Sequence, residues 1–279
     1  MEGNPVRKIR IMGIVNLTDD SFFAGSRFLG KDGSFDPGLF LSRVASMRSE
    51  GADIIDLGAC STRPGSESVS EEEEWLRLKP ALDLLAREDP GVDISVDTFR
   101  PGIVTRAFDT IGPFIVNDVS GGSDAMWKLV GGKGLTYVAM HTRGTPKDMQ
   151  DLTDYDDVVS SVKSFFDGIS ETADAFGVKD WILDPGFGFG KTVEQNFGVF
   201  HSLEILQEAG RPVLVGISRK RMVWMPLGLT PDTAGEATQR LHLEALERGA
   251  DILRVHDVPE TLETLARYRQ EALHPGEQE

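Results

Sequence analysis

Short apolar runs recur along the whole chain, and each of them ends in a polar residue. The runs are nearly continuous in isoleucine, valine and leucine, which is typical of parallel β-strands buried on both faces. The pattern therefore predicts a sheet of eight parallel strands. The predicted strands cover residues 9–16, 52–58, 93–98, 114–120, 136–141, 181–184, 212–218 and 250–257.

The segments between these runs carry the signals of helices. Ser70-Glu-Glu-Glu73 has the pattern of a capping box and predicts a helix that reaches about Arg87. Asp36-Pro37 predicts a helix start with proline at the first helical position, and Pro101 and Pro231 predict starts of the same kind. Longer helices are predicted over residues 156–176, 193–209, 233–248 and 260–272.

Eight strands that alternate with helices over about 250 residues are the pattern of a (β/α)8 TIM barrel, an α/β fold. We expect a single domain over residues 1–279, with a core at about 9–272 and a frayed tail at 273–279. A doubly wound open sheet is the alternative, although it usually has fewer strands and a glycine signature after the first. In a barrel, function is expected at the carboxyl ends of the strands, where the polar residues of the runs fall.

The composition excludes several classes of protein. Of the 279 residues, 40% are hydrophobic and 27% are charged, as in ordinary globular proteins. No apolar run approaches the ~18 residues of a membrane helix, and the first residues lack the apolar core of a signal peptide, so we expect a cytoplasmic protein. A net charge of −16 argues against nucleic acid and anionic membranes as partners. The single Cys60 excludes an internal disulfide and a cysteine-based zinc site.

Residues 181–191 join a predicted strand to a glycine-rich loop. Asp184 ends the strand as a buried carboxylate, which is unfavourable unless something binds it. The three following glycines allow close approach, and Phe187 and Phe189 can offer flat faces to a planar ring. The spacing fits neither a phosphate-binding P-loop nor a dinucleotide fingerprint. The stretch predicts a site for something polar and flat, the alternative being a glycine-rich turn with a structural aspartate.

Two clusters of cations predict an anion site. Ser218-Arg-Lys-Arg221 stands at the predicted start of a helix, where cations oppose the helix dipole and a bound anion would gain both side chains and free N–H groups. Arg254 and His256 are two residues apart on the last strand, so both point into the barrel, and an inward arginine requires an anion or a carboxylate close by. The loop Cys60-Ser-Thr-Arg-Pro-Gly65 exposes an arginine and two hydroxyls, a weaker signal of the same kind.

Other strand ends supply groups for a flat ligand. Asp97 and Asn117 lie at matching depth on the third and fourth predicted strands. With Asp184 they provide the acceptors and donors that a planar, multiply aminated heterocycle requires. Cys60 and His141 are left outside the site, because a lone cysteine or strand-end histidine is more often structural.

Asn16 ends the first predicted strand and opens a polar loop that reaches about Asp36. Its carbonyl oxygen, with the nearby carboxylates of Asp19 and Asp20, is a hard ligand suited to Mg²⁺ that is shared with a phosphate. These oxygens make the loop a candidate Mg²⁺ site with Asn16 as a protein ligand. The alternative is a hydrogen-bonded loop asparagine.

The motifs taken together resemble the dihydropteroate synthase family. Each motif is modest alone, but the set occurs in order over residues 13–257, nearly the whole chain. The matching motifs are Gly13-Ile-Val-Asn-Leu-Thr-Asp-Asp-Ser-Phe22, Ser61-Thr-Arg-Pro-Gly65, Val96-Asp-Thr98, Val116-Asn-Asp118, Met140-His141, Leu183-Asp-Pro-Gly-Phe-Gly-Phe-Gly-Lys191, Gly216-Ile-Ser-Arg-Lys220 and Arg254-Val-His-Asp257.

This resemblance implies a reaction of folate biosynthesis, the condensation of (7,8-dihydropterin-6-yl)methyl diphosphate with p-aminobenzoate to 7,8-dihydropteroate and diphosphate. It also implies a homodimer that sulfonamides target. Asn16 would help bind Mg²⁺ with the diphosphate. The catalytic residues implied are Asp97, Asn117, Asp184 and Lys220, which hold the pterin, and Arg254 and His256, which with Arg63 surround the diphosphate. The remaining substrate-binding residues implied are Thr62, Pro64, Phe189 and Ser218 beside p-aminobenzoate, together with Met140 and Gly216.

The sequence departs from the family pattern in three places. Asp19 stands where proline is common, Ala59-Cys60 replaces a glycine and a larger polar residue, and Arg221 adds a cation after Lys220. Two other functions remain as alternatives. A methyltransferase that passes methyl from methyltetrahydrofolate to a corrinoid protein would need no diphosphate site, so the cations argue against it. A catalytically silent pterin-binding barrel would not need both the pterin and the anion sets.

Overall fold

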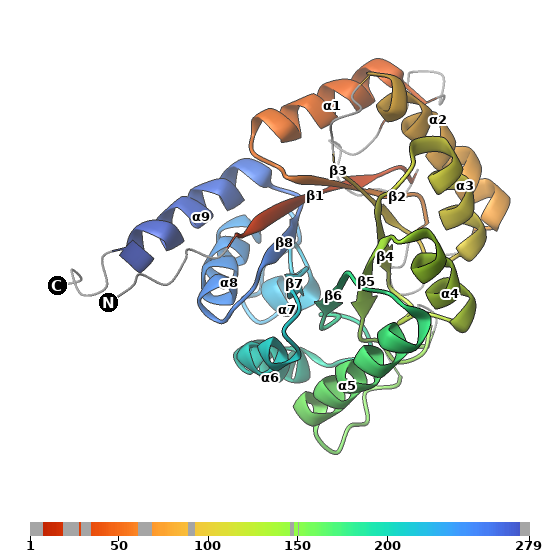
Figure 1. The fold of residues 1–279 in the computed structure, drawn as a ribbon. Coiled ribbons are helices and arrows are strands. Elements are labelled where there is room, and N and C mark those ends of the chain that lie inside the picture. Colours follow the sequence, from red (N-terminus) through yellow and green to blue (C-terminus); the bar gives the residue numbers. More distant parts are fainter. Residues whose placement is uncertain are drawn as a thin grey trace.

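The computed structural model describes residues 8–18, 28, 35–60, 69–88, 93–145, 148–149 and 151–273. Figure 1 shows a ring of strands surrounded by helices. All strand pairs are parallel, in the order β6-β5-β4-β3-β2-β1-β8-β7. The strands are β1 (Arg10–Asn16), β2 (Ile54–Gly58), β3 (Asp93–Asp97), β4 (Ile115–Asp118), β5 (Thr136–Met140), β6 (Trp181–Asp184), β7 (Leu214–Val215) and β8 (Ile252–Val255).

The ring closes between β6 and β7 through a short contact. An isolated parallel bridge joins Leu183 to Val213, and the Leu183 amide donates to the Pro212 carbonyl at 2.9 Å. The fold is therefore the predicted (β/α)8 TIM barrel, and the doubly wound alternative is wrong. The run predicted at 212–218 forms only the two residues of β7, because the chain turns at its end and the Lys220 amide donates to the Ile217 carbonyl at 3.0 Å.

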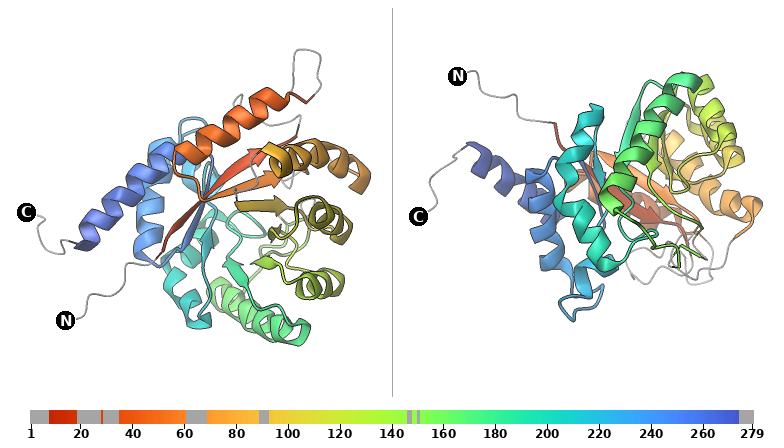
Figure 2. Two further views of the ribbon diagram at one scale, coloured as in Figure 1. Left: turned by 45° about the horizontal axis from the view of Figure 1, so that its top comes forward. Right: turned by 90° about the horizontal axis from the view of Figure 1, so that it is seen from below.

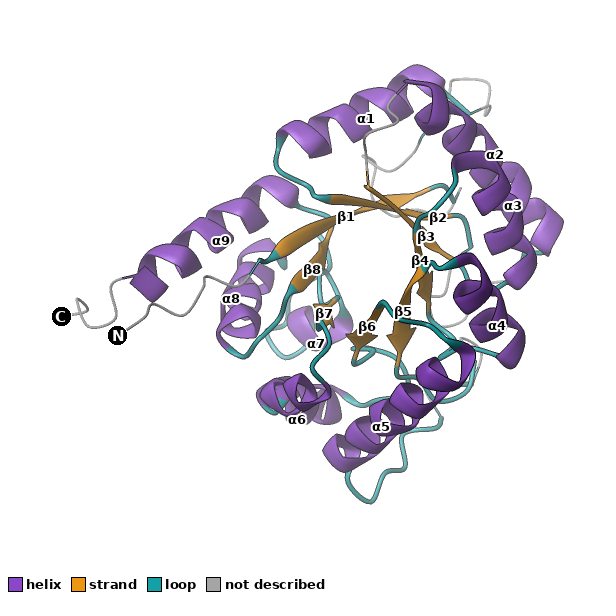
Figure 3. Cartoon of the chain, viewed as in Figure 1, coloured by secondary structure: helices purple, strands orange, loops and turns teal. Residues whose placement is uncertain are grey.

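Helices cover the outer face of the sheet on all sides, as Figures 2 and 3 show. Apolar side chains of the outward strand faces and of the helices form one continuous core between the two layers. None of the described helices is long and apolar enough to cross a membrane. The helices are α1 (Pro37–Ser49), α2 (Glu71–Glu88), α3 (Pro101–Ile111), α4 (Asp124–Lys133), α5 (Val158–Phe176), α6 (Val193–His201), α7 (Arg221–Trp224), α8 (Gly235–Glu247), α9 (Val258–Leu273) and the 3-10 helix η2 (Leu203–Ala209).

Most predicted helix starts are correct. The Asp36 carboxylate accepts from the amides of Gly38 and Leu39, the Ser70 hydroxyl accepts from the Glu73 amide, and Pro101 opens α3. The start predicted at Pro231 is wrong. That proline lies in a turn in which the Thr233 amide donates to the Thr230 carbonyl at 3.1 Å, and α8 begins afterwards.

The helix predicted at 193–209 is divided. α6 stops at His201, Ser202 adopts φ −113° and ψ 21°, and the chain continues as the 3-10 helix η2. The His201 carbonyl at the end of α6 accepts from the Arg248 guanidinium at 2.9 Å. Serine competes for backbone hydrogen bonds and so lowers the stability of a helix interior, and a side chain from far along the chain satisfies the freed carbonyl.

The inside of the barrel has an apolar lower layer. Seven strands each contribute one buried side chain to it, while β3 contributes Ser95, which pairs in register with Ile115. This layer closes the barrel below the carboxyl ends of the strands, so the inward residues one step further along each strand form the floor of any site. The seven apolar residues are Met12, Ile54, Ile115, Val138, Ile182, Leu214 and Ile252.

Candidate active site

A cavity of about 1590 Å³ opens at the carboxyl ends of the strands, above the apolar layer. The structure brings to it eleven of the fourteen predicted site residues, from seven of the eight strands or the loops that follow them. Thr62, Arg63 and Pro64 lie outside the described residues. The eleven are Asn16, Asp97, Asn117, Met140, Asp184, Phe189, Gly216, Ser218, Lys220, Arg254 and His256.

Arg254 lies on the floor of this cavity between two carboxylates. Its Nε donates to Asp56 Oδ2 at 2.7 Å, and its Nη2 lies 2.8 Å from Asp97 Oδ2 and 2.6 Å from Asp56 Oδ2. Burial would lower the pKa of Arg254, but the two carboxylates raise it above its ordinary value, so the guanidinium stays charged. The partner that an inward arginine requires is therefore present.

Asp97, the second carboxylate beside Arg254, has its pKa raised to about 7. Burial is the main cause, the Arg254 cation opposes it, and the neighbouring Asp56 carboxylate adds to it. An acid that titrates near neutral pH in a cavity is a common property of functional sites.

Asp56 was not predicted as a site residue. The sequence signal is the alternation on β2, because Asp56 follows the inward Ile54 by two residues and must also point inward. Its carboxylate is completely buried and contacts both Arg254 and the Asn117 amide. The sequence gives no indication of these partners, which are 61 and 198 residues away along the chain.

Asp184 ends β6 at the start of the glycine loop. Its Oδ1 accepts from the Gly186 amide at 2.8 Å. Burial raises the pKa of the carboxyl group, while the Lys220 cation and the Gly186 amide oppose this increase. Gly186 adopts φ 67°, and a side chain there would collide with the His141 carbonyl. Only glycine therefore lets the chain turn here and bring its amide onto the carboxylate.

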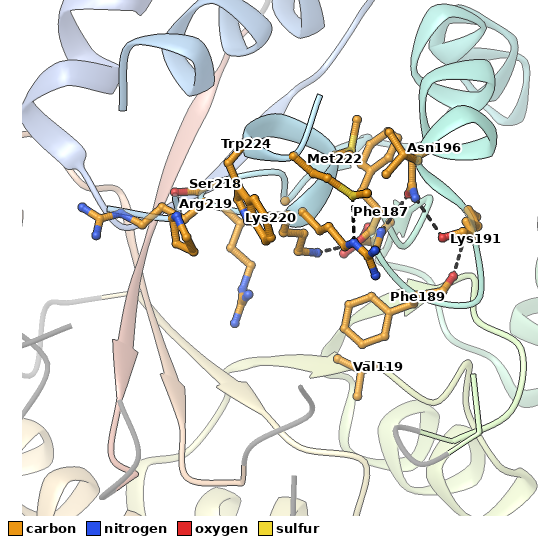
Figure 4. A pocket seen from close by; sticks show the side chains of 18 of the residues that line it. Val119, Phe187, Phe189, Lys191, Asn196, Ser218, Arg219, Lys220, Met222 and Trp224 are labelled. Atoms are coloured by element: carbon orange, nitrogen blue, oxygen red, sulfur yellow. Dashed lines mark hydrogen bonds between the residues drawn. The ribbon is translucent and has the colours of Figure 1, made fainter. Parts of the chain in front are cut away.

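Two lysines fix the backbone of the glycine loop. Lys191 Nζ lies 3.1 Å from the Gly186 and Phe189 carbonyls and 3.4 Å from the His141 carbonyl. Lys220 Nζ donates to the Phe187 carbonyl at 2.6 Å and stands 4.9 Å from the centre of the Phe189 ring (Figure 4). Burial is the main cause that lowers the pKa of Lys191 to about 7 and that of Lys220 to about 8. The role of Lys191 was not predicted from the sequence.

The two aromatic residues of the loop have different environments. Phe187 is fully buried and packs edge-to-face on Phe200, with ring centres 6.0 Å apart, so the expectation that its face is open to a ligand is wrong. Phe189 is half-buried and lies under Lys220 on the cavity wall (Figure 4).

The residues predicted to bind an anion have different partners in the structure. Ser218 Oγ lies 3.0 Å from His256 Nδ1, so the ends of the β7 and β8 segments meet at the cavity. Arg219, by contrast, pairs with Asp257 through Nη2 at 2.6 Å and Nε at 3.1 Å, while its backbone adopts φ 58°. The expectation that all three cations of 219–221 are free for an anion is therefore wrong for Arg219.

Asn16 lies at the end of β1 and lines the cavity, half-buried. Its amide oxygen would be 3.5 Å from a side-chain carbon placed on Gly58, on the side of the barrel where Asp97 lies. Mg²⁺ often uses only one or two protein oxygens, with waters and substrate phosphates completing its six ligands. The donor fits such a shared ion. The described residues contain no cluster of three metal-binding side chains, and Asp19 and Asp20 lie outside them.

His141 was left outside the site, and it does not line the cavity. It is buried against Phe165 at 5.2 Å between ring centres, and its Nδ1 has no hydrogen-bond partner within the described part of the chain. Burial is the main cause that lowers its pKa to about 3, so it is neutral at pH 7.

The sequence is similar to those of known proteins over nearly its whole length. The pterin binding enzyme family matches residues 12–256. The dihydropteroate synthase of Neisseria meningitidis serogroup C is 40% identical over 264 residues, which are 92% of this chain and 91% of that protein.

Solved structures are similar over the same length. The Yersinia pestis dihydropteroate synthase in complex with a sulfonamide drug has a TM-score of 0.86 at 34% identity, covering 94% of each chain. The Thermus thermophilus enzyme in complex with 4-aminobenzoate has a TM-score of 0.83 at 36% identity, also covering 94% of each chain. The chain therefore belongs to the pterin-binding enzyme family, and its function is that of a dihydropteroate synthase in folate biosynthesis.

Proposed function

We propose that this cavity joins (7,8-dihydropterin-6-yl)methyl diphosphate to p-aminobenzoate, forming 7,8-dihydropteroate and releasing diphosphate. One observation carries the proposal: three hydrogen-bonding residues, Asp97, Asn117 and Asp184, share a single cavity with the cations Lys220 and Arg254. An aminated ring requires the first set together with Lys220, and a diphosphate requires a cation such as Arg254. The relatives described above are dihydropteroate synthases, which favours this condensation over methyl transfer.

The ring is proposed to lie on the floor of the cavity. Asp184, Asn117 and Asp97 are at most 9% exposed, so a ring in contact with them is removed from water, where hydrogen bonds to charged groups contribute more. Carboxylates accept from the N–H groups of an amino-pyrimidine edge. The Lys220 cation interacts electrostatically with Asp184 and lies over the Phe189 ring. It is therefore placed to donate to a ring oxygen or nitrogen.

The diphosphate is proposed to lie toward the mouth, between the ends of β1 and β8. Arg254 and His256 come from β8 and the residue that follows it, Ser218 contacts His256, and Asn16 ends β1. We propose that Asn16 also helps hold Mg²⁺, which would neutralise the charge of the diphosphate. Arg63 remains a predicted member of this set.

The chemistry then follows from positioning and charge. The bond between the methylene carbon and the diphosphate oxygen breaks, and its electron pair leaves with the diphosphate. Electron release from the ring stabilises the methylene cation, with the Asp184 carboxylate beside it. The amine nitrogen of p-aminobenzoate forms the new C–N bond and then loses one proton, to the released diphosphate or to water. No serine or cysteine nucleophile is required, because electrostatic stabilisation and proximity supply the rate enhancement.

We also propose that the protein acts as a homodimer, in the cytoplasm, and that sulfonamides compete for its p-aminobenzoate site. The Yersinia neighbour crystallised with a sulfonamide drug supports the last point. Analytical ultracentrifugation tests the dimer, and competition between a sulfonamide and p-aminobenzoate in the assay below tests the inhibitor.

Diphosphate release, measured with and without p-aminobenzoate, tests the reaction. We expect release that depends on p-aminobenzoate and yields equal amounts of dihydropteroate. Asp184→Asn should reduce it strongly, whereas Asp167→Asn on the exposed side of α5 should not. A catalytically silent barrel would release no diphosphate under either condition, and that result would contradict the proposal.

A further inference from the structure

Asp56 is a completely buried carboxylate that contacts two residues of the cavity floor without belonging to the wall of the cavity. It lies on β2, one step above the apolar layer. Its Oδ2 accepts from Arg254 Nε at 2.7 Å, and both its oxygens face Asn117 Nδ2, at 3.3 and 3.4 Å. The simplest role for such a group is to neutralise a buried arginine, and Asp97 provides a second carboxylate for the same purpose.

The contact with Asn117 has a further consequence. A carboxylate beside an arginine only accepts hydrogen bonds, so the nitrogen end of the Asn117 amide must face Asp56. The amide plane is then fixed. Its carbonyl Oδ1 and the second N–H of Nδ2 remain for a ligand, in one order and not the reverse.

An amide edge with an acceptor beside a donor recognises the complementary edge of a ring. A ring nitrogen with a free lone pair next to an exocyclic amino group, –N=C–NH2, fits it with two hydrogen bonds. The reversed edge, –NH–C=O, would fit only if the asparagine amide turned over. In a dihydropterin, N1 and the 2-amino group form the first edge. In the 2-oxo analogue, a dihydrolumazine, N1–H and the 2-oxo group form the reversed edge, –NH–C=O.

We infer that Asp56 is a positioning residue that fixes the orientation of the Asn117 amide and thereby selects a 2-amino ring over a 2-oxo ring. This inference rests on the proposed function and adds the determinant of its ring specificity. Asp56 itself need not touch the substrate.

The test compares two ligands on three proteins by calorimetry. The ligands are 6-hydroxymethyl-7,8-dihydropterin and 6-hydroxymethyl-7,8-dihydrolumazine, and the proteins are the wild type, Asp56→Asn and Asp97→Asn. An asparagine at 56 can offer its own N–H to Asn117, so the amide of Asn117 is free to turn over. We expect the preference for the 2-amino ring to shrink roughly 10- to 100-fold, the scale of one or two hydrogen bonds to buried groups.

Asp97→Asn is the matched control. It also removes a carboxylate from Arg254, but within the described part of the chain its side chain makes no hydrogen bond to the Asn117 side chain. We expect it to weaken both ligands by a similar factor and leave the preference unchanged. A variant Asp56→Asn that weakens both ligands equally would overturn the inference, because its role would then be only to neutralise Arg254. If the wild-type protein shows no binding of dihydropterin above the buffer control, the proposed function would instead be contradicted.

A measurement on the wild-type protein covers the case in which Asp56→Asn does not fold. Protein labelled with ¹⁵N-asparagine is compared with Asn117→Ser to assign the Asn117 side-chain amide by nuclear magnetic resonance. We expect one of its two protons to exchange slowly with solvent and to shift downfield, because a carboxylate holds it. Two rapidly exchanging protons would show that the amide is not fixed and would overturn the inference.

Discussion

The inner faces of the barrel strands carry two layers that lie one step apart and have opposite chemistry. On β2, β4, β6 and β8 an isoleucine is followed two residues later by a polar side chain, with the pairs Ile54/Asp56, Ile115/Asn117, Ile182/Asp184 and Ile252/Arg254. Both layers point inward and both are largely buried. The same strands therefore serve two purposes at two depths. The lower layer contributes stability, and the upper layer places polar and charged groups where a ligand can contact them.

The largest change in stability is expected in the lower layer. Ile182→Ala removes a side chain that is 5% exposed and leaves a cavity inside the barrel. We expect the free energy of unfolding to fall by about 2–5 kcal/mol, measured by urea denaturation, while the affinity for a dihydropterin stays within about threefold at low temperature. Leu152→Ala, at a side chain that is 41% exposed, is the control. A matching loss of affinity would show that the two layers are not separable.

The next effect belongs to the upper layer. Asp184→Asn keeps the shape of the side chain but removes its charge, so we expect dihydropterin binding to weaken by roughly 2–4 kcal/mol. Because burial already raises the pKa of this carboxyl group, stability should change little. Calorimetry gives the affinity and thermal unfolding gives the stability. Unchanged affinity would remove Asp184 from the ring site.

The positions of the site residues could be predicted from the sequence, but the contacts between them could not. Asp97, Asn117 and Asp184 were located by their positions at the carboxyl ends of predicted strands, and Arg254 by the alternation of the last strand, which places it on the inner face. These signals could not reveal the contacts between strands, such as Arg254 with Asp56 across 198 residues. For the same reason Arg219 was expected to be free, although it pairs with Asp257, and Lys191 was overlooked, although it holds three carbonyls.

A smaller effect is expected in the pH dependence of stability and of ligand affinity, through Asp97. The folded pKa of Asp97 is about 7, above its ordinary value of 3.8, so the folded chain holds this proton more tightly than the unfolded chain. The contribution to stability is complete below the unfolded pKa and is lost as the pH rises to about 7. Ligand affinity should follow the opposite course, because the ionised carboxylate accepts from the ring N–H groups much more strongly than the protonated carboxyl group does.

We therefore expect dihydropterin affinity to rise with pH and to level off above about 7, with a slope of about tenfold per pH unit below it. Calorimetry between pH 5.5 and 8.5 would be compared with Asp97→Asn, whose profile should lose this step. An identical profile in the variant would assign the step to another group.

The smallest expected effect concerns the metal. Asn16→Ala removes one oxygen from an ion that waters and phosphate oxygens would otherwise surround, so we expect the Mg²⁺ concentration for half-maximal activity to rise by about three- to tenfold. Asn16→Asp keeps an oxygen at the same place and is the matched control. Full turnover of the wild type in excess chelator would show that the cationic side chains act without a metal.

The apolar layer also determines the route by which substrates and products enter and leave the site. Seven side chains fill the barrel from below, so among the described residues the open path for substrates and products is the cavity at the carboxyl ends of the strands. The ring site is at the bottom of this passage, and an amine that arrives first would stand in the way of the ring. We therefore expect an ordered mechanism in which the pterin enters first. Dihydropteroate should then compete with the pterin diphosphate rather than with p-aminobenzoate.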